Sequence, residues 1–416
     1  MGETDRTIAD GPRLSPAEER LLLLLSRPAL PPEQIATAVE LRAQVTQWPL
    51  LITTSYRKFV LPMVWGNLSG LPPDAMQEDL RKSIRTMSRT LTSMTLQRLA
   101  AFDWFHAHCV LPSGIEYAYF KGPALASHLY PDPCTRFFRD VDILVASQDR
   151  LGLLRRARDL GCRLYAHAWA DATELTLADD DALEDFLFIN SVPHIMTPQG
   201  LLIEMHTEVD YHTSLFDTRA LLEGSMDVTI RGRPVRILPD TAHFVFICYH
   251  HTRHMWSKLH WIADLDAFCN APGFDRIAAL AMGRRLGIET TISAALELHD
   301  LASQGRHPSE FDRLTPGADL LQACLETLSG DLELETALRR RRKQRAFALG
   351  FDWQPTPVSH WRRVWLRLRK IKVSYAVFHR IPGGRNWRHL RYGCALGIRL
   401  MTDAPRALRA ALGRRA

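Results

Sequence analysis

The sequence predicts an α+β fold, in which a small mixed sheet with its helices is flanked by helical regions on both sides. Helical stretches separated by prolines fill the chain up to residue 110. A strand, a helix and a second strand then follow in that order up to residue 145, and helix-type apolar spacing returns after residue 239. The 416 residues, 46% hydrophobic and 24% charged, exceed one average domain and have the composition of a globular protein.

The first segment, residues 1–110, is expected to be entirely helical. Ser15 precedes Pro16, and two acids follow in the first turn, which is the pattern of a capped helix start. Further helices are expected at 32–47, 49–67 and 73–108. Their apolar stripes indicate packing, and no chemical motif stands out among them.

A short acidic strand carries the first chemical signal. Asp140 and Asp142 are followed by the apolar run 143–145, which is typical of a buried strand. Side chains alternate along a strand, so the two aspartates project on one face, about 7 Å apart. Like charges at this distance repel unless a cation lies between them, and carboxylate sites suit Mg²⁺ or Mn²⁺.

A glycine turn precedes this strand. Lys121, Gly122 and Pro123 follow a strand expected at 116–120 and open a helix expected at 124–130. The N-terminus of a helix with a lysine beside it is a phosphate-binding arrangement.

A second acidic strand is expected at 200–209, joined by a turn to a strand at 186–196, and residues 171–185 are expected to form an exposed acidic connection. On the second strand Glu204 and His206 share one face. Three roles stay open for His206: it orients a ligand, contacts a substrate, or is a hydrogen-bonded structural histidine.

Three motifs together resemble a known family. Residues Lys121, Gly122, Ala124 and Leu125 match K-G-x-A-L; Arg136, Asp140 and Asp142 match R-x-x-x-D-h-D-h; and Glu204 holds the acidic place of h-h-[DE]-h-H. This pattern resembles the DNA polymerase β type of nucleotidyltransferase core, and in particular an uncharacterised bacterial family of that superfamily, over residues 117–301. One departure is Pro123, where the superfamily usually has serine. Proline has no amide proton, so phosphate binding must depend on Lys121 and neighbouring groups.

The resemblance implies a Mg²⁺-dependent nucleotidyltransferase, with Mn²⁺ as the alternative ion, that moves a nucleoside monophosphate from a nucleoside triphosphate such as ATP to an acceptor hydroxyl or phosphate. The acceptor is left open among small molecules, sugars, peptides and proteins. By the same resemblance the catalytic and metal-binding residues are Asp140, Asp142 and Glu204. The nucleotide-binding residues are expected to be Lys121, Gly122, Arg136, Arg139, Arg253 and Lys258.

A helix is expected to begin at residues 239–241 and to carry two histidines, His250 and His254, on one face. A zinc site is not favoured, because no third ligand is apparent and no glutamate follows the first histidine. The motif at 259–265 resembles a family segment beside which Arg253, His254 or Lys258 reaches the nucleotide phosphates. The alternative is that its tryptophan and leucine are core residues and that Asp264 pairs with a cation.

The C-terminal region is strongly basic. About 21 Lys and Arg follow residue 338 against two acids, so the net charge of +6 leaves the preceding part net acidic by about thirteen. Apolar residues at helical spacing in 361–375, flanked by arginines, fit a helix that meets an anionic membrane surface or an acidic partner. Packing on the catalytic domain is the more frequent role of such a helix, and 366–372 also fits a strand.

The expected domains are a helical region at 1–110, a catalytic core at 111–238, a helical domain at 239–336 that closes the nucleotide cleft, and a basic region at 337–416. Seven cysteines without C-x-x-C spacing indicate reduced thiols. The polar first 13 residues lack the zones of a signal peptide. We therefore expect a cytoplasmic protein, with peripheral attachment to the inner membrane as an option.

Two functions of other classes remain open. One is a nucleotide-binding toxin-like or regulatory protein that keeps the fold without general transferase activity. Metal-dependent binding without pyrophosphate release would indicate it. The other is a basic scaffold for a membrane surface or nucleic acid, whose binding would survive the loss of both aspartates.

Overall fold

The computed structural model describes residues 13–73, 76–167, 171–175, 179–210, 214–328, 351, 353–354, 361, 373 and 375–412. The chain forms two compact units. Unit 1 comprises Met1–Phe102, Ala118–Val141 and Glu223–Pro357, and unit 2 comprises Asp103–Tyr117, Asp142–Leu222 and Val358–Ala416. The boundary between them falls inside the acidic strand, directly before Asp142.

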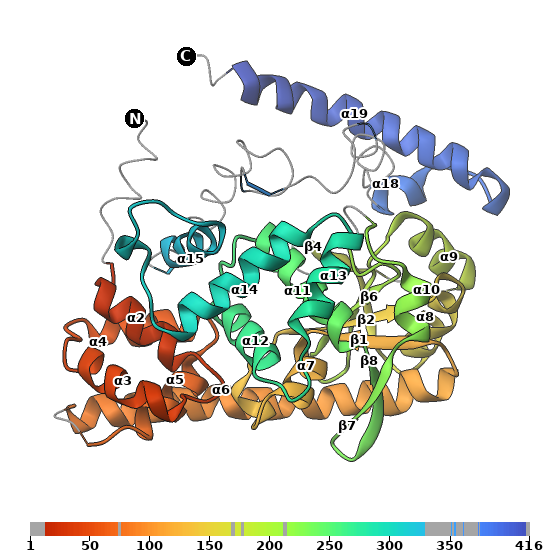
Figure 1. The fold of residues 1–416 in the computed structure, drawn as a ribbon. Helices are drawn as coiled ribbons and strands as arrows, with labels where there is room; N and C mark the ends of the chain where they lie inside the picture. The colour runs from red at the N-terminus through yellow and green to blue at the C-terminus, as the bar shows by residue number, and fades with distance from the viewer. Residues whose placement is uncertain are drawn as a thin grey trace. The chain divides into compact units, whose positions relative to one another are not determined.

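Unit 1 begins with a series of helices (Figure 1). They are α2 (Pro16–Leu25), η1 (Pro32–Gln34), α3 (Ile35–Arg42), α4 (Trp48–Arg57), α5 (Leu61–Ser69) and α6 (Glu78–Phe105), the last of which runs into unit 2. The Ser15 side chain accepts the Glu18 N–H and the Glu18 carboxylate accepts the Ser15 N–H, so a capping box starts α2. The capped helix start at Ser15 is as predicted from the sequence.

The rest of unit 1 combines three strands with a group of helices. The strands are β1 (Tyr117–Phe120), β8 (Arg233–Ile237) and β7 (Met226–Ile230), in the order β1-β8-β7, with β1 parallel to β8 and β7 antiparallel to it. Arg231 and Gly232 have φ of 51° and 78°, which is the geometry of a tight hairpin turn between β7 and β8. The helices are α7 (Gly122–Leu129), η4 (Pro133–Thr135), α11 (Asp240–Arg253), α12 (Leu259–Cys269), α13 (Arg276–Arg285), α14 (Glu289–Ser303), η6 (Pro308–Glu310) and α15 (Pro316–Glu326).

Unit 2 is built on strands in the order β4-β3-β5-β6-β2, whose β3/β4, β3/β5 and β5/β6 pairs are antiparallel. The strands are β2 (Asp140–Val145), β3 (Arg163–His167), β4 (Asp171–Leu175), β5 (His194–Met196) and β6 (Leu202–His206). The helices are η2 (His106–Val110), η3 (Leu111–Ser113), η5 (Ser147–Asp149), α8 (Arg150–Asp159), α9 (Asp180–Ile189), α10 (Thr218–Glu223), α18 (Tyr375–Arg380), η7 (Arg385–Trp387) and α19 (Arg388–Leu412) (Figure 1). Together, the parallel and antiparallel pairs and the many helices give the predicted α+β class.

The segment before β5 differs from the sequence-based prediction. Residues 186–189 belong to helix α9 and not to a strand, and the expected acidic connection contains β4 and the start of α9. The Asp179 carboxylate accepts the Ala182 N–H at 2.8 Å, and two further aspartates lie in the first turn. Acids at this end of a helix interact favourably with its dipole. The acidic run therefore starts a helix, whose Leu183 and Phe186 are buried.

The C-terminal helices of unit 2 pack against α9. Phe378 of α18 and Ala395 of α19 share a buried apolar cluster with Ile189. The Asp185 carboxylate accepts hydrogen bonds from Arg388 Nε at 2.6 Å and from Arg391 Nη1 at 2.7 Å. Helix α18 and the first part of α19 are thus held against α9 by apolar packing and by ion pairs.

Most of the predicted amphipathic segment 361–375 lies outside the described residues, as does 329–336. The helical domain and the basic region proposed from the sequence remain predictions. Among the helices that the structure describes, none is both long and apolar enough to cross a bilayer.

Candidate active site

Three side chains of unit 2 converge at the start of β2 and the end of β6. The Nε2 atom of His206 lies 3.1 Å from Asp142 Oδ1 and 3.6 Å from Glu204 Oε2. One ligand atom from each of the three residues falls within 4.8 Å of the others. Strand alternation produces this geometry, because Ile203 and Met205 point into the core while Glu204 and His206 point to the other face.

A second histidine extends this group. His194 lies directly opposite Glu204 in the β5/β6 register, and its Nε2 atom is 3.7 Å from Glu204 Oε1. His194 is buried, with 5% of its side chain exposed. His194 is near Oε1 of Glu204 and His206 is near Oε2, so each Glu204 oxygen has an imidazole near it.

Because Asp142 and Glu204 are largely removed from water, their negative charges are unfavourable unless a positive charge lies beside them. The exposed fractions are 4% for the Asp142 side chain and 18% for Glu204. Burial alone lowers the pKa of His206, but the Asp142 and Glu204 carboxylates outweigh burial and raise it above its ordinary value. The imidazolium is therefore favoured at a position where a positive charge offsets two acids.

The donor atoms fit a divalent cation. Two carboxylate oxygens are typical ligands of Mg²⁺ and Mn²⁺, and an imidazole nitrogen is more usual for transition metals such as Zn²⁺. A set of this kind can hold a cation directly through all three residues. It can also hold one through the acids alone, with His206 orienting Asp142. His206 is thus the member of the group whose role the sequence pattern left open.

Asp140, the other predicted ligand, lies two residues before Asp142 on β2 and is not part of this group of three. It is half-buried, and its charge favours the protonated form of Arg98. Asp140 and Asp142 are two residues apart in β2, which is the spacing at which side chains of a strand share a face. The proposed role of Asp140 as a metal ligand remains a prediction.

The glycine turn of unit 1 is strained. Lys121 has φ 57° and ψ −156°, and Gly122 has φ 40°. A Cβ atom on Gly122 would lie 3.1 Å from the Asp140 carbonyl oxygen, so the close approach of these two backbone segments favours glycine. Strained backbone at a non-glycine residue such as Lys121 is concentrated at functional sites.

A buried histidine holds this turn. The Lys121 N–H donates to Nε2 of His243 at 3.1 Å. Burial lowers the pKa of His243 to about 3, so the ring is neutral and able to accept this hydrogen bond. The ammonium group of Lys121 lies 5.3 Å from the centroid of the Phe120 ring.

Arg136 forms a buried ion pair with Asp264. Its Nε and Nη2 atoms donate to the two carboxylate oxygens at 2.5 and 2.6 Å, and Tyr130 Oη donates to the same carboxylate at 2.7 Å. Burial opposes the charge of Arg136, but Asp264 outweighs it and raises the pKa. Arg136 Nη1 also donates to the Gly122 carbonyl at 3.3 Å. Asp264 therefore pairs with a cation, the alternative that the sequence left open, and Arg136 ties α12 to the glycine turn.

The other predicted phosphate ligands contact aromatic rings. Arg139 Cζ and Lys258 Nζ lie 5.3 and 5.6 Å from the centroid of the Phe59 ring. Arg253 Cζ lies 5.7 Å from the ring of Tyr249. The structure thus brings Arg139 and Lys258 to one ring and Arg253 to another.

The histidines of α11 form an aromatic packing group. The rings of His250 and His254 are 4.7 Å apart, and His251 stacks on Trp261 at 4.4 Å with an interplanar angle of 7°. Burial holds the pKa values of His250 and His251 well below their ordinary range. Among the residues that the structure describes, the group in which three potential metal ligands meet is the one containing Asp142.

The α+β fold and the acids of β2 and β6 are consistent with the class of nucleotidyltransferases. The chain matches the sequence profile of the family described as uncharacterised nucleotidyltransferase over residues 44–302, more than half of its length. It belongs to this family. The match begins within the N-terminal helical region, well before the first motif that suggested the resemblance. No curated protein matches the chain.

Proposed function

We propose that the protein transfers a nucleoside monophosphate from a nucleoside triphosphate to an acceptor hydroxyl or phosphate, with a divalent cation held by Asp142 and Glu204. The observation that carries this proposal is the convergence of Asp142, Glu204 and His206 within 4.8 Å in a member of a nucleotidyltransferase family. Mg²⁺ is the proposed ion and Mn²⁺ the alternative.

When bound, such a cation supplies Lewis-acid polarisation of a phosphoryl oxygen and neutralises charge on the leaving group. Asp142 and Glu204 supply its carboxylate ligands, and Asp140 on the same strand face is proposed to share in this. Glu204 is half-buried and more exposed than the buried Asp142, and it is the proposed acceptor of the proton from the attacking hydroxyl.

The residues of the glycine turn are proposed to bind the nucleotide phosphates. Helix α7 begins at Gly122, and the positive end of a helix favours a negatively charged phosphate. Lys121 supplies a positive charge directly before the turn. Arg136 is proposed to act mainly by holding the turn, because its guanidinium already pairs with Asp264.

The test is a turnover assay on the full-length protein. Each of the four common nucleoside triphosphates is incubated with Mg²⁺ or Mn²⁺ and a panel of metabolite, sugar, peptide and protein acceptors, and pyrophosphate release is measured. We expect release that depends on both the cation and one class of acceptor. Cation-dependent nucleotide binding without pyrophosphate release under any of these conditions would contradict the proposal and favour a regulatory role.

A further inference from the structure

Helix α4 ends in an unusual way. The N–H groups of Phe59 and Val60 donate to the carbonyls of Tyr56 and Ser55 at 3.2 and 3.0 Å, which is the pair of hydrogen bonds that closes a helix on a left-handed residue. That residue is usually glycine, but here it is Phe59, with φ 64°. A side chain in this conformation is disfavoured by contacts of its Cβ atom. Non-glycine residues held in this conformation are uncommon, and backbone strain of this kind also occurs at binding sites.

The Phe59 ring is the centre of a group of rings and cations. It stacks on Phe137 with a centroid distance of 5.4 Å and an interplanar angle of 17°. Arg139 and Lys258 lie against Phe59, and Arg98 Cζ lies 4.7 Å from the centroid of Phe137. We call these five residues the ring–cation cluster. All of them belong to unit 1.

The cluster draws its cations from separate parts of the chain. Arg98 is on α6, Arg139 is in the loop before β2, and Lys258 is the N-cap residue of α12. The first-turn amides of α12 therefore lie beside Lys258, and the positive end of a helix favours an anion. Side chains this far apart in sequence meet here because the fold brings them to the same two rings.

Like charges oppose one another in this cluster. Burial lowers the pKa of Arg98, and the charge of Arg139 lowers it further, although Asp140 acts in the opposite direction. The His260 ring lies 5.6 Å from Phe59, and its pKa is held well below the ordinary value by burial and by nearby cations that include Lys258 and Arg139. The negative faces of the rings offset part of this repulsion. A bound anion would offset more of it.

We propose that Arg98, Arg139 and Lys258, positioned by the rings of Phe59 and Phe137, form a binding subsite for a phosphate group. Two guanidinium groups and an ammonium group are the side chains that bind phosphate in proteins, the first through paired hydrogen bonds and the second as a point charge. Arg139 and Lys258 were expected to bind nucleotide from the sequence. Arg98, Phe59 and Phe137 are additional, and they give the N-terminal helical region a part in ligand binding. This proposal rests on the proposed function in one respect: the transferase reaction supplies the two candidate sources of the phosphate group, the nucleotide and a phosphorylated acceptor.

The test is calorimetric titration of the full-length protein with inorganic pyrophosphate in metal-free buffer of low ionic strength. Arg98→Met is compared with Arg89→Met, which removes the same charge from an exposed position on the same helix. We expect Arg98→Met to weaken pyrophosphate binding by about 10- to 100-fold, as for a lost charge-assisted hydrogen bond, and Arg89→Met to change it by less than about twofold. Equal effects of the two variants would show that only net charge matters and would overturn the subsite.

A second variant keeps the proposal testable if Arg98→Met does not fold. Lys258→Met removes a half-buried charge from the same cluster, and thermal melts check that each variant is folded. If folded Lys258→Met and Arg98→Met both bind pyrophosphate as tightly as the unaltered protein, the proposal is wrong. A loss of binding in the folded Lys258→Met variant supports it even where Arg98→Met does not fold.

Two further titrations are needed. The first distinguishes the nucleotide from a phosphorylated acceptor as the source of the phosphate, and the second distinguishes the subsite from the proposed transferase function. Titration in the presence of a saturating non-hydrolysable nucleoside triphosphate with Mg²⁺ abolishes pyrophosphate binding if the subsite takes the nucleotide phosphates, and leaves it if the subsite takes an acceptor phosphate. Asp142→Asn, outside the cluster, should retain metal-free pyrophosphate binding. Pyrophosphate binding that depends on Arg98 would support the subsite even if no transferase activity were found. Failure of the proposed function is therefore distinguishable from failure of the subsite.

Discussion

At the scale of single residues, the site brings two acids together, of which Asp142 is buried and Glu204 is half-buried. Asp142 and Glu204 both approach His206, whose protonated form is favoured by their charges although burial opposes it. Two neighbouring carboxylates repel each other, and this repulsion costs most when no positive charge lies beside them. Removing one acid should therefore remove metal binding without a large penalty to folding.

Asp142→Asn tests this directly. The amide keeps the shape of the side chain but loses the charge that holds a cation, so we predict that metal-dependent pyrophosphate release falls by at least about 10²–10³-fold. The melting temperature should stay within a few degrees or rise, because a like-charge interaction is removed. Steady-state kinetics and thermal melts give the two measurements.

The matched comparison is Asp140→Asn on the same strand. An equal loss of turnover in the two variants would support Asp140 as a further ligand, and a small loss would limit the cation site to the converging group. Wild-type turnover in the Asp142→Asn variant would exclude the assignment of this acid as a metal ligand.

Lys121 gives a second prediction at this scale. Its backbone is held in a strained conformation by the hydrogen bond to His243, which fixes where the side chain begins. Lys121→Met keeps the aliphatic stem and removes the charge, so nucleotide affinity should fall by about 1.5–3 kcal/mol. Calorimetric titration with a non-hydrolysable triphosphate measures this, and Lys82→Met at an exposed position of α6 is the control. An unchanged dissociation constant for the Lys121 variant would rule out a phosphate contact.

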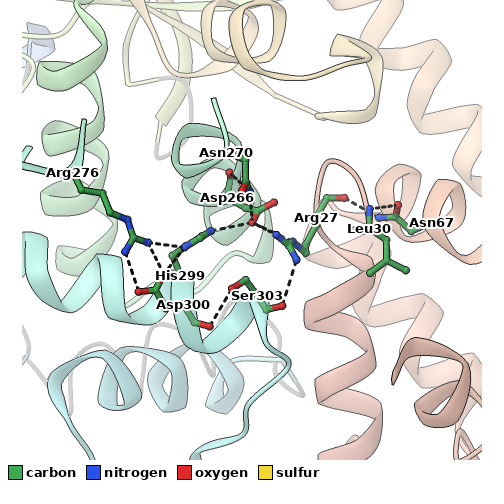
Figure 2. A network of polar contacts seen from close by, with 9 residues as sticks. All are labelled: Arg27, Leu30, Asn67, Asp266, Asn270, Arg276, His299, Asp300 and Ser303. Atoms are coloured by element: carbon green, nitrogen blue, oxygen red, sulfur yellow. Dashed lines mark hydrogen bonds and ion pairs between the residues drawn. The ribbon is translucent and has the colours of Figure 1, made fainter. Parts of the chain in front are cut away.

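At the scale of elements, a polar network joins three helical segments of unit 1. The Asp266 carboxylate of α12 accepts hydrogen bonds from Arg27 Nη2 at 2.7 Å and lies 3.1 Å from Nε2 of His299 on α14 (Figure 2). Asp300 lies on the other side of the imidazole, 3.0 Å from its Nδ1 atom, and also pairs with Arg276. Figure 2 shows these side chains between helices that are far apart in sequence, so the network links α2's C-terminal end to α12 and α14.

This network predicts a pH dependence of stability. Burial disfavours the charged form of His299, but Asp266, Cys269 and Asp300 favour it, and the net pKa is about 10. Because the folded-state pKa is above the ordinary value of 6.5, the imidazolium contributes fully below about pH 6.5, and its contribution is lost as the pH rises through about 10. The contribution is on the order of a few kcal/mol, with Arg276 beside the ring acting against it.

Thermal melts between pH 6 and 10.5 measure the effect by comparing the protein with His299→Gln. We expect the stability advantage of the unaltered protein to be largest near pH 6 and to shrink toward pH 10. A difference between the two proteins that stays constant over this range would show that His299 is neutral in the folded state.

The elements that were predicted well are those specified by local signals. The capping box at Ser15, the prolines between the N-terminal helices and the apolar run after Asp142 act within a few residues, and the structure has helices or a strand at each of them. The alternation that placed Glu204 and His206 on one face is also local. Helix α9 was missed because its acidic first turn looks like a solvated loop until the Asp179 cap is considered.

The site was predicted less completely because its partners are far apart in sequence. The pairing of Arg136 with Asp264 spans 128 residues, and nothing near Arg136 in the chain distinguishes this buried pair from a phosphate contact. In the same way, Phe59 and Arg98 carry no motif of their own. Their proximity to Arg139 and Lys258 is set by tertiary packing, which a local pattern does not encode.

At the scale of the whole molecule, the excess of positive charge lies in a different part of the sequence from the residues of the candidate active site. The basic residues are concentrated after residue 338, yet not all of them are available to a partner. Arg388 and Arg391 pair with Asp185 on α9, so deleting the C-terminal region would leave a buried carboxylate without these partners and expose the apolar face around Ile189. Such a deletion would confuse loss of stability with loss of binding.

Charge substitution avoids this difficulty. We predict that replacing Arg339–Arg342 with glutamine weakens binding to vesicles of anionic lipid, by about 1 kcal/mol for each arginine that meets the surface, while metal-dependent nucleotide binding and the melting temperature stay unchanged. Arg391→Met is the converse control: it should lower the free energy of unfolding by about 1–3 kcal/mol, because a partner of the buried Asp185 carboxylate is lost. Co-sedimentation across a salt series measures the vesicle binding, which must weaken as salt screens the attraction. Full-length protein that stays in the supernatant even at low salt would exclude a membrane partner for the basic region and leave an acidic acceptor as the ligand for these charges.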